Sequence, residues 1–448
     1  MRLALFINPT GHHQASWRHP RADADAGVSF EHYKRLALAA ERAKLDAVFL
    51  ADNQNVRRGA PEAVGRVAQF VANFEPLTLI AALSAVTERI GFISTASASY
   101  NYPYQVARKF ASLDFISGGR VGWNIVTSGP PEAPNFGRDE HYGDDVRYIR
   151  AAEFVEVCLG LWDSWEDDAF PRDKATGIFS DLSKMHVLAH EGEYFRVRGP
   201  LNIPRSPQGR PLLVQAGASP AGMDFAARFA EMVFVTPQTI DEARATYAKL
   251  KEGAARHGRD PDHLKVMPGL SAIVGHTRRD AEDTFGLLQS LLHPDVTLAA
   301  LSFRIQGDVT RYPLDEPLPE SAGAGANPGF FAQWMDVARR ENLTLRELAL
   351  RASGSMSGLA VRGSADDIAD MMEEWFVSGA ADGFNLQPAY LPGGFDDYVE
   401  LVLPELRRRG LVRTEYSGRT LREHFGLPRP DWRPRPRRVE SGSGTAAK

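Results

Sequence analysis

The chain has 448 residues, of which 43% are hydrophobic and 24% charged, and its formal net charge is -5. Such a composition is typical of one large globular domain or two medium ones, and the mild acidity argues against nucleic acid as the main partner. A single cysteine, Cys158, excludes internal disulfides and a cysteine-rich zinc site. The sequence contains neither a signal-peptide pattern nor about 20 consecutive apolar residues, so we expect a cytoplasmic protein with no membrane association.

Short apolar segments alternate with helical patterns along the chain. Eight segments have the apolar, β-branched composition of buried strands: they are residues 2–7, 47–51, 90–96, 120–126, 211–217, 231–236, 265–275 and 382–389. The segments that follow them have the periodicity of amphipathic helices: residues 30–45, 76–87, 104–117, 147–165, the segment after Ser219, 241–258, 364–376 and 395–410.

Eight strands, each followed by a helix, predict a parallel sheet that is covered on its outer face. This pattern is typical of an α/β TIM (β/α)8 barrel. A doubly wound open sheet has the same periodicity and remains the alternative, because periodicity does not reveal whether a sheet closes.

The chain is longer than a bare barrel, which needs about 250 residues. We expect a single barrel domain over residues 1–430, with long insertions near 53–75, 129–146, 166–208 and 293–362. The last insertion contains the Pro/Gly-rich stretch 313–329, for which we expect a mobile lid or a subunit contact. Residues 431–448 are Pro/Arg-rich and then Gly/Ser-rich, which predicts a disordered tail.

Polar side chains gather where the predicted strands end, which is where barrel enzymes place their chemistry. His12 follows the first strand and Asp52 the second, Thr95 lies in the third, and Ser128 ends the fourth. After the fifth strand comes a Gly-Ala-Ser turn in which Ser219 is a predicted helix N-cap. The free N–H groups of such a helix start would bind a phosphate.

Each of these residues also has an ordinary structural interpretation. Ser219 would cap its helix without any ligand, and His12 would be a surface histidine. Asp52 would pair with Arg57 or Arg58. The tyrosines at positions 100, 102 and 104 would be packing residues of a loop.

Motifs of other enzyme classes are missing from the sequence. It has no HExxH zinc motif, no GxSxG nucleophile turn, no P-loop and no GxGxxG after a strand. A barrel mouth with hydroxyls, aromatic rings and a phosphate seat suits flavin mononucleotide (FMN), which has one terminal phosphate, better than NAD.

Several long segments resemble one enzyme family. The matching segments are GGRVGWNIVTS (118–128), NFG (135–137), 146–169, 172–181, 190–219 and TEYSGRTLREHFGL (414–427). They are similar to the FMN-dependent monooxygenases that act on nitrilotriacetate, dibenzothiophene sulfone and long-chain alkanes, within the bacterial luciferase-like superfamily. The resemblance, from about residue 2 to 430, implies a TIM barrel that uses reduced FMN and dioxygen. It also implies a separate NAD(P)H:flavin reductase and a homodimer or homotetramer.

The resemblance also assigns roles to single residues. It implies flavin contacts at five positions: Asp52, Thr95, Ser128, Tyr148 and Ser219. It places His12 at a position associated with catalysis, where we expect a near-neutral pKa and proton management, with Trp17 and Arg18 holding its loop.

The sequence departs from the family pattern at two positions. Asp144 stands where relatives have a histidine, and an aspartate would not replace a phosphate-binding histidine. Gly129 stands where the alkane enzyme has a histidine, which argues against alkane oxidation.

The predicted activity is oxygenation of a small organic substrate of the organosulfur, heterocyclic or aminopolycarboxylate class. Arg57, Arg58, Arg304 and Arg311 are the candidate cations for a polycarboxylate, and the tyrosines with Phe303 are the candidate contacts for the other classes. Two alternatives remain: a deazaflavin-dependent oxidoreductase of the same superfamily, or a flavin-binding barrel without catalysis.

Overall fold

The computed structural model describes residues 1–56, 59–69, 71–324, 326, 328–354 and 359–433. Eight parallel strands form its centre: β1 (Arg2–Phe6), β2 (Ala47–Leu50), β3 (Gly91–Ser97), β4 (Val121–Val126), β7 (Leu212–Gln215), β8 (Met232–Val235), β9 (Lys265–Val274) and β11 (Gly383–Leu386). They pair in this order, β11 pairs with β1, and β8 pairs with β9, which closes the ring. The predicted barrel is therefore confirmed, and the open sheet is excluded.

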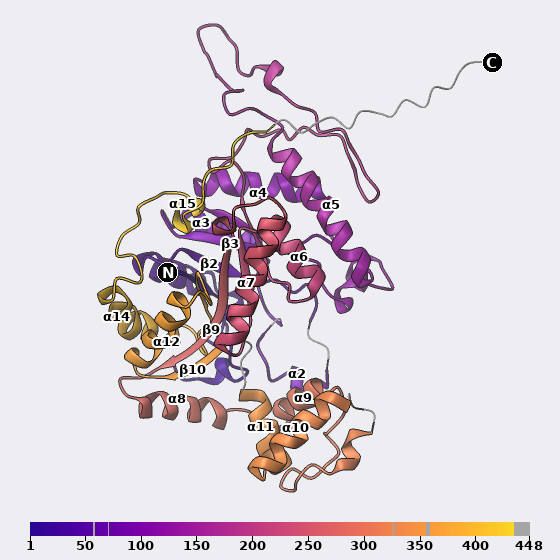
Figure 1. Cartoon of the computed structure of the whole chain (residues 1–448), viewed down its shortest axis with the longest axis vertical. Helices are drawn as coiled ribbons and strands as arrows, with labels where there is room; N and C mark the ends of the chain where they lie inside the picture. The colour runs from indigo at the N-terminus through magenta and orange to yellow at the C-terminus, as the bar shows by residue number, and fades with distance from the viewer. Residues whose placement is uncertain (57–58, 70, 325, 327, 355–358, 434–448) are drawn as a thin grey trace, which may run out of the picture.

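Helices cover the outside of the barrel (Figure 1). The predicted helices are present as α1 (Phe30–Arg42), α3 (Pro76–Ala85), α4 (Pro103–Ser117), α5 (Asp144–Trp162), α6 (Pro220–Phe229), α7 (Ile240–Arg256) and α12 (Ala365–Val377). The last predicted helix is α13 (Gly393–Asp397), a π-helical turn over Tyr398–Val402, and α14 (Leu403–Arg408). The layer between strands and helices is the main hydrophobic core, in which Trp123 is fully buried.

A short C-terminal helix, α15 (Leu421–Phe425), closes the amino-terminal end of the barrel. Leu421 and Phe425 belong to the same buried cluster as the inward-facing Ala4, Ile93 and Met232. Gly91 is required for this contact, because a Cβ there would lie 2.3 Å from Leu421 Cδ1. Among the described residues, the apolar interior is thus filled at this end of the barrel.

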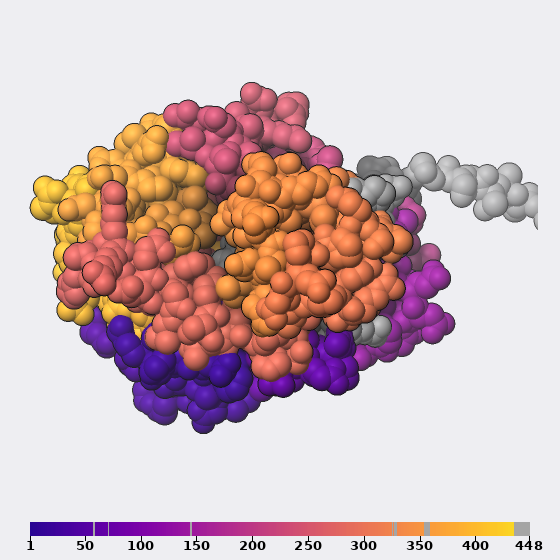
Figure 2. Space-filling view, turned by 90° about the horizontal axis from the view of Figure 1, so that it is seen from below, coloured from indigo at the N-terminus to yellow at the C-terminus, as the bar shows by residue number. Residues whose placement is uncertain are grey.

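The insertion after β9 forms a separate group of helices at the other end of the molecule. It begins with α8 (Arg278–Ser290) and continues with α9 (Pro294–Ile305), α10 (Pro328–Glu341) and α11 (Leu345–Gly354). The last three, which we call the bundle, have their own hydrophobic core. Figure 2 shows the bundle, in orange, across the lower face next to the N-terminal segments in indigo. The bundle contacts α2 (Pro61–Val64), which follows β2, so it lies beside the carboxyl ends of the strands.

Several elements in the inserted segments were not predicted. They include α2, the helices of the bundle, β10 (Leu359–Gly363), which pairs with β9, and the short hairpin of β5 (His190–Glu191) and β6 (Arg196–Val197). The beginning of the Pro/Gly-rich stretch 313–329 contacts the start of α11, where Leu345 N donates to Glu316 O and Arg346 N to Leu314 O, both at 2.8 Å. Of the predicted tail, residues 431–433 are described, and Trp432 Nε1 donates to Asp163 O at 3.0 Å. Residues 434–448 lie outside the described residues. None of the described helices is long and apolar enough to span a membrane.

Candidate active site

Thr95 connects three neighbouring strands at the carboxyl end of the barrel. Its Oγ1 donates to Leu50 O at 3.0 Å and accepts from Asn124 Nδ2 at 2.8 Å. Thr95 and Asn124 are register partners and lie two residues beyond the inward-facing Ile93 and Gly122, so both face the barrel interior. The Oδ1 atom of Asn124 is buried and has no partner among the described residues, which leaves one acceptor open toward the mouth.

Ser128 explains why β4 ends abruptly. Its φ of 54° is in the left-handed region, which a serine rarely adopts and which turns the chain out of the strand. Its Oγ lies 2.6 Å from Ser97 Oγ at the end of β3. The chain then continues through Gly129 into the 3-10 helix Pro130–Phe136. The hydroxyl of Ser128 therefore stays at the rim of the barrel, next to the third strand.

Asp52 is a half-buried carboxylate after β2. Burial raises its pKa to about 6, and the negative charges of Glu75 and Glu132 add to this shift. Burial also raises the pKa of Glu132. The predicted alternative partners Arg57 and Arg58 lie outside the described residues. A carboxylate that is held in such unfavourable surroundings is typical of a ligand-binding or catalytic site.

Tyr148 and Ser219 meet at the start of α6. The predicted N-cap is confirmed, because Ser219 Oγ accepts from Gly222 N at 3.1 Å and Pro220 takes the first helical position. A Cβ at Gly222 would lie 2.7 Å from the hydroxyl oxygen of Tyr148, and one at Gly217 would lie 3.1 Å from it. The two glycines thus allow the phenol of α5 to reach the helix start. The four residues form a cradle with a hydroxyl and a phenol, in which Gly217 N donates to Gln215 Oε1 at 2.7 Å and Gly222 N donates to Ser219 Oγ.

His12 is held by the segment that follows β11. Its backbone N–H and its ring Nδ1 both donate to Pro388 O, at 2.9 and 3.3 Å, and its ring meets Phe6 edge-on at 4.8 Å. The other ring nitrogen, Nε2, is buried and has no partner among the described residues. Burial lowers the pKa of His12 to about 4, so the predicted near-neutral pKa is wrong. The ring is neutral near pH 7 and presents Nε2 as a proton acceptor.

The residues predicted to hold the His12 loop have other contacts. Trp17 Nε1 donates to Arg66 O at 2.9 Å, and Arg18 donates to Leu291 O. These bonds connect the loop to the segment after α2 and to the end of α8, and they do not touch the His12 ring.

The sequence analysis missed two polar residues inside the barrel. Asn385 is fully buried with both amide atoms unpartnered among the described residues, and Gln387 Oε1 is likewise unpartnered. Alternate residues of a strand share a face, and a Cβ at Gly269 would lie 2.8 Å from Gln387 Oε1. The polar alternation in the strand 382–389 was the signal that could have revealed them.

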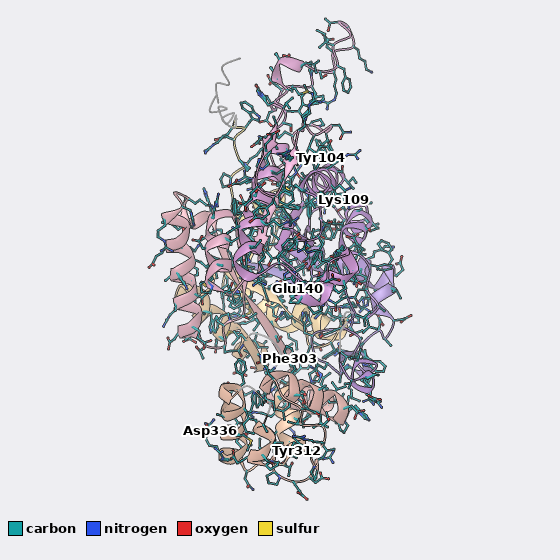
Figure 3. All side chains as sticks on the ribbon, turned by 90° about the vertical axis from the view of Figure 1, so that its right-hand side faces the viewer. Tyr104, Lys109, Glu140, Phe303, Tyr312 and Asp336 are labelled. Carbon is teal, nitrogen blue, oxygen red and sulfur yellow. The ribbon has the colours of Figure 1, made fainter. Side chains whose placement is uncertain are left out.

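The candidate substrate contacts are distributed differently from the prediction. Tyr100 stacks on Phe136 at 4.6 Å, and its hydroxyl lies 2.6 Å from His141 Nδ1, which places it in the wall formed by the loop after β4. Tyr102 is 72% exposed. Tyr104 packs against the main core, and Figure 3 shows it far from the bundle.

The remaining candidates belong to the bundle. Arg304 Nε donates to Ala352 O at 2.9 Å within the bundle. Arg311 donates to the hydroxyl of Tyr312, and Figure 3 shows Tyr312 toward the end of the bundle that is away from the barrel. Phe303 is 82% exposed and lies where the bundle meets the barrel. The side chain of Asp144 is not described. The described residues contain no group of three potential metal ligands.

The comparisons with known proteins agree with the barrel fold. The sequence profile described as "luciferase-like monooxygenase" matches residues 10–383. The chain is 45% identical to N-acetyl-S-(2-succino)cysteine monooxygenase of Bacillus subtilis, over 96% of this chain and 97% of that protein. It is 44% identical to nitrilotriacetate monooxygenase component A of Aminobacter aminovorans, again over 96% and 97%. Among solved structures, it is similar to a riboflavin lyase with modified FMN and riboflavin, with a TM-score of 0.82, 32% identity and 97% coverage of both chains.

Proposed function

The chain belongs to the luciferase-like monooxygenase family and is a monooxygenase, and we propose that it uses reduced FMN and dioxygen to oxygenate a small organic substrate. The reduced FMN comes from a separate NAD(P)H:flavin reductase. This part of the proposal is supported by the name of the Aminobacter relative, which is called component A. The substrate is an organosulfur, heterocyclic or aminopolycarboxylate compound.

The cradle of Tyr148 and Ser219 is the observation that carries the proposal. A helix start that is lined by glycines leaves room for a phosphate and offers it the hydroxyl of Ser219, the phenol of Tyr148 and the positive end of the helix dipole. FMN ends in a single phosphate, so this donor set fits it. A dinucleotide would need a second phosphate position, and no glycine-rich turn after another strand supplies one.

The rim of the barrel supplies contacts for the ring system of the flavin. Thr95, Ser128 and Asp52 come from three successive strand ends, and the unpartnered Oδ1 of Asn124 faces the same interior. Carboxylate and amide oxygens accept hydrogen bonds from ring N–H groups. The carboxylate of Asp52 and the amide oxygen of Asn124 would accept hydrogen bonds from the N–H groups of a reduced flavin.

Reduced FMN, when bound, supplies the electrons that activate dioxygen, so that one oxygen atom enters the substrate and the other leaves as water. The protein's own part is to orient the reactants and to exclude water. The aromatic rings of Phe6, Phe49 and Phe234 contact one another in the barrel interior and keep the floor of the site apolar. His12 Nε2, neutral and unpartnered, accepts or returns a proton at the substrate side.

The proposal includes a homo-oligomer that works in the cytoplasm. The inserted segment near 166–208 extends from the barrel in Figure 1, and Ile178, Phe179 and Leu182 on it are 51%, 65% and 64% exposed. Apolar side chains of this kind on an extended segment favour contact with a second subunit.

Oxygen consumption by the purified chain tests the proposal. With NADH alone the chain should consume little NADH, because it lacks a dinucleotide seat. Addition of FMN and a flavin reductase should start dioxygen uptake that depends on substrate. Robust NADH oxidation by the single chain would contradict the two-component proposal. Binding of a deazaflavin in place of FMN would favour the deazaflavin-dependent oxidoreductase. Dioxygen uptake that no substrate stimulates would favour a flavin-binding barrel without catalysis.

A further inference from the structure

Three polar side chains line one side of the barrel interior, where β9 and β11 lie side by side. Asn385 pairs in register with Gly269 on one neighbouring strand and with Ala4 on the other. Alternate residues of a strand share a face, so Gln387 and Ser271 lie on the same inner surface, one step nearer the mouth. All three side chains are fully buried. We call Asn385, Gln387 and Ser271 the polar stripe.

The polar stripe contains four atoms that have no partner among the described residues: both amide atoms of Asn385, Oε1 of Gln387 and Oγ of Ser271. A buried amide or hydroxyl without a hydrogen bond destabilises a protein, and native structures satisfy nearly all such groups with protein atoms or ordered water. Ala4 and Gly269, which flank Asn385, have no side chain that can form a hydrogen bond. The four atoms therefore need partners that the neighbouring side chains do not supply.

The polar stripe leads to His12 at the mouth. Gln387 directly precedes the residue whose carbonyl oxygen fixes the His12 ring. Phe6 meets that ring edge-on at 4.8 Å and meets Phe234 at 5.9 Å. A Cβ at Gly269 would lie 2.9 Å from Phe234 Cε2 and 2.8 Å from Gln387 Oε1, so the amide lies beside the same aromatic floor. His12 Nε2, buried and without a described partner, is thus a fifth atom of the same kind.

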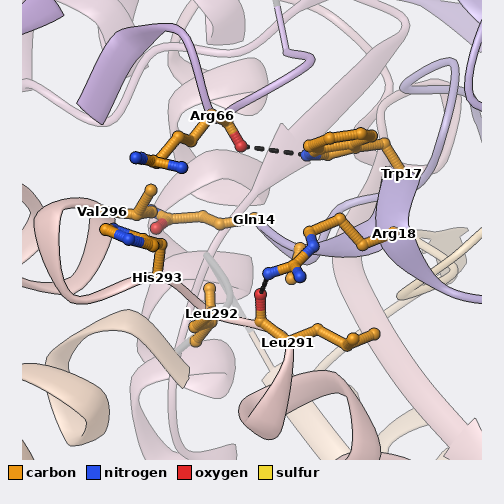
Figure 4. A pocket seen from close by; sticks show the side chains of 9 residues that line it. Gln14, Trp17, Arg18, Arg66, Leu291, Leu292, His293 and Val296 are labelled. Atoms are coloured by element: carbon orange, nitrogen blue, oxygen red, sulfur yellow. Dashed lines mark hydrogen bonds between the residues drawn. The ribbon is translucent and has the colours of Figure 1, made fainter. Parts of the chain in front are cut away.

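Contacts on the outside of the His12 loop leave this nitrogen untouched. Figure 4 shows that Trp17 Nε1 donates to the carbonyl oxygen of Arg66, and that Arg18 donates to that of Leu291. These bonds hold the loop to its neighbours. Burial is the largest cause of the low pKa of His12, and no charged side chain of the described residues opposes it. When the ring takes a proton, its new N–H group therefore needs an acceptor from another source.

We propose that the polar stripe and Nε2 of His12 together hold a chain of internal water molecules, which keeps His12 hydrogen-bonded in both of its protonation states. A neutral Nε2 needs a donor and a protonated one needs an acceptor. A water molecule that rotates serves both states, whereas the carbonyl oxygen of Gln387 only accepts. An internal water typically makes about three hydrogen bonds to buried polar groups, which the stripe supplies.

Gln387 is in this view a positioning residue, which acts on the reaction through the water and His12. The proton itself moves only between the reacting group and Nε2, and the chain stabilises the charged ring while it carries that proton. This role in the reaction rests on the proposed function, whereas the water chain itself does not depend on a bound flavin.

Nitrogen-15 NMR of the flavin-free chain, labelled in its histidines, tests the water chain without turnover. The signals of His12 are identified by their loss in His12→Ala. Near pH 7, Nε2 of the wild type should resonate as an acceptor that receives a hydrogen bond. Gln387→Leu and Ser271→Ala should each move its signal toward that of a free imidazole nitrogen. Ser271→Ala removes a single oxygen atom, so it keeps the test valid if Gln387→Leu folds poorly.

Ser94→Ala is the matched control. Ser94 is also fully buried with an unpartnered Oγ among the described residues, but it lies between Phe92 and Ala96, which belong to the core outside the strands. This variant should leave the His12 signal unchanged. A free Nε2 in the wild type, or a signal that neither stripe variant moves, would overturn the inference. So would a high-resolution crystal structure with a dry interior beside Asn385.

The reductase-coupled assay tests the role of Gln387. Gln387→Leu should lower product per dioxygen about 10-fold or more, the factor that one hydrogen bond to a charged group is worth. Combined with His12→Ala it should lower product no further, because both changes act on the same proton. An additive loss would contradict the positioning role. A wild type that forms no product with FMN and reductase contradicts the proposed function, while the NMR signals decide on the water chain independently.

Discussion

The two ring nitrogens of His12 have different roles. Nδ1 donates to Pro388 O and fixes the ring, while Nε2 is buried beside Phe6 without a described partner. Because burial lowers its pKa to about 4, the histidine stays neutral over the whole physiological range and accepts a proton only when the reaction supplies one.

Replacement of His12 by alanine should separate oxygen uptake from product formation. Product should fall by about 100- to 10,000-fold, the usual cost of a lost acid–base group, while FMN affinity stays nearly unchanged. Dioxygen uptake should persist and yield hydrogen peroxide, since oxygen would still be reduced without productive transfer. Peroxide and product are measured together in one reductase-coupled assay, with His263→Ala, in the 3-10 turn before β9, as control. A variant that loses FMN binding, or that forms product as efficiently as the wild type, would show that His12 is structural.

For single residues, the sequence predicts the location of a side chain better than its pKa. Thr95, Ser128 and Ser219 were predicted at the mouth because strand ends of a barrel meet at one rim. The pKa of His12 was not predictable, since it depends on burial by Pro388 and its neighbours, which are far away in the chain. The flavin contacts themselves remain predictions.

Helix α15 is the element that closes the amino-terminal end of the barrel. Its Arg422 forms two hydrogen bonds with Glu231, at 2.8 and 2.9 Å, and Glu231 also accepts from Leu213 N. Burial opposes ionisation of Glu231, but Arg422 and Arg210 outweigh it and lower its pKa to about 2. This pair fixes the helix at the amino-terminal end of the barrel.

Glu231→Gln should therefore reduce the free energy of unfolding by about 3–5 kcal/mol near pH 7, because it leaves Arg422 buried without its counter-charge. The pKa of Glu231 is lower in the folded state than in the unfolded chain, so its stabilisation is complete above about pH 4.5 and is lost as the pH falls toward 2. Urea unfolding at about pH 7 and pH 3 should show a large difference from the wild type that shrinks at the lower pH. The exposed Glu252→Gln should change stability by less than about 0.5 kcal/mol at both. A pH-independent difference would contradict the assigned ionisation.

At the scale of elements, the apolar periodicity predicted all eight barrel strands and the helices that follow them. Helix α8, which directly follows β9, was not predicted. The bundle and β10 were not predicted either, because the Pro/Gly-rich stretch 313–329 in the same segment indicated a lid or a subunit contact. A local signal for α8 was present: Thr277 and Asp280 form a capping box, which the spacing Thr-x-x-Asp can indicate.

The two ends of the barrel differ in what covers them. One end of the barrel is filled by α15, and the other carries the strand-end loops with the bundle beside them (Figures 1 and 2). Such an arrangement leaves one face for a cofactor and a substrate, with the α6 cradle at the carboxyl end of β7. Closure of the ring follows from the length and order of the strands, whereas the position of the bundle depends on contacts such as Arg66 with Asp295.

Anaerobic titration with reduced FMN tests the central claim, that the flavin binds at this mouth with its phosphate at the start of α6. The wild-type chain should bind one FMN, and Ser219→Ala and Tyr148→Phe should each weaken binding by about 1–2 kcal/mol, the value of one hydrogen bond to a charged group. The controls Ser183→Ala and Tyr312→Phe, in the inserted segments, should bind like the wild type. Unchanged affinity in both cradle variants would contradict the account and move the phosphate to another part of the molecule.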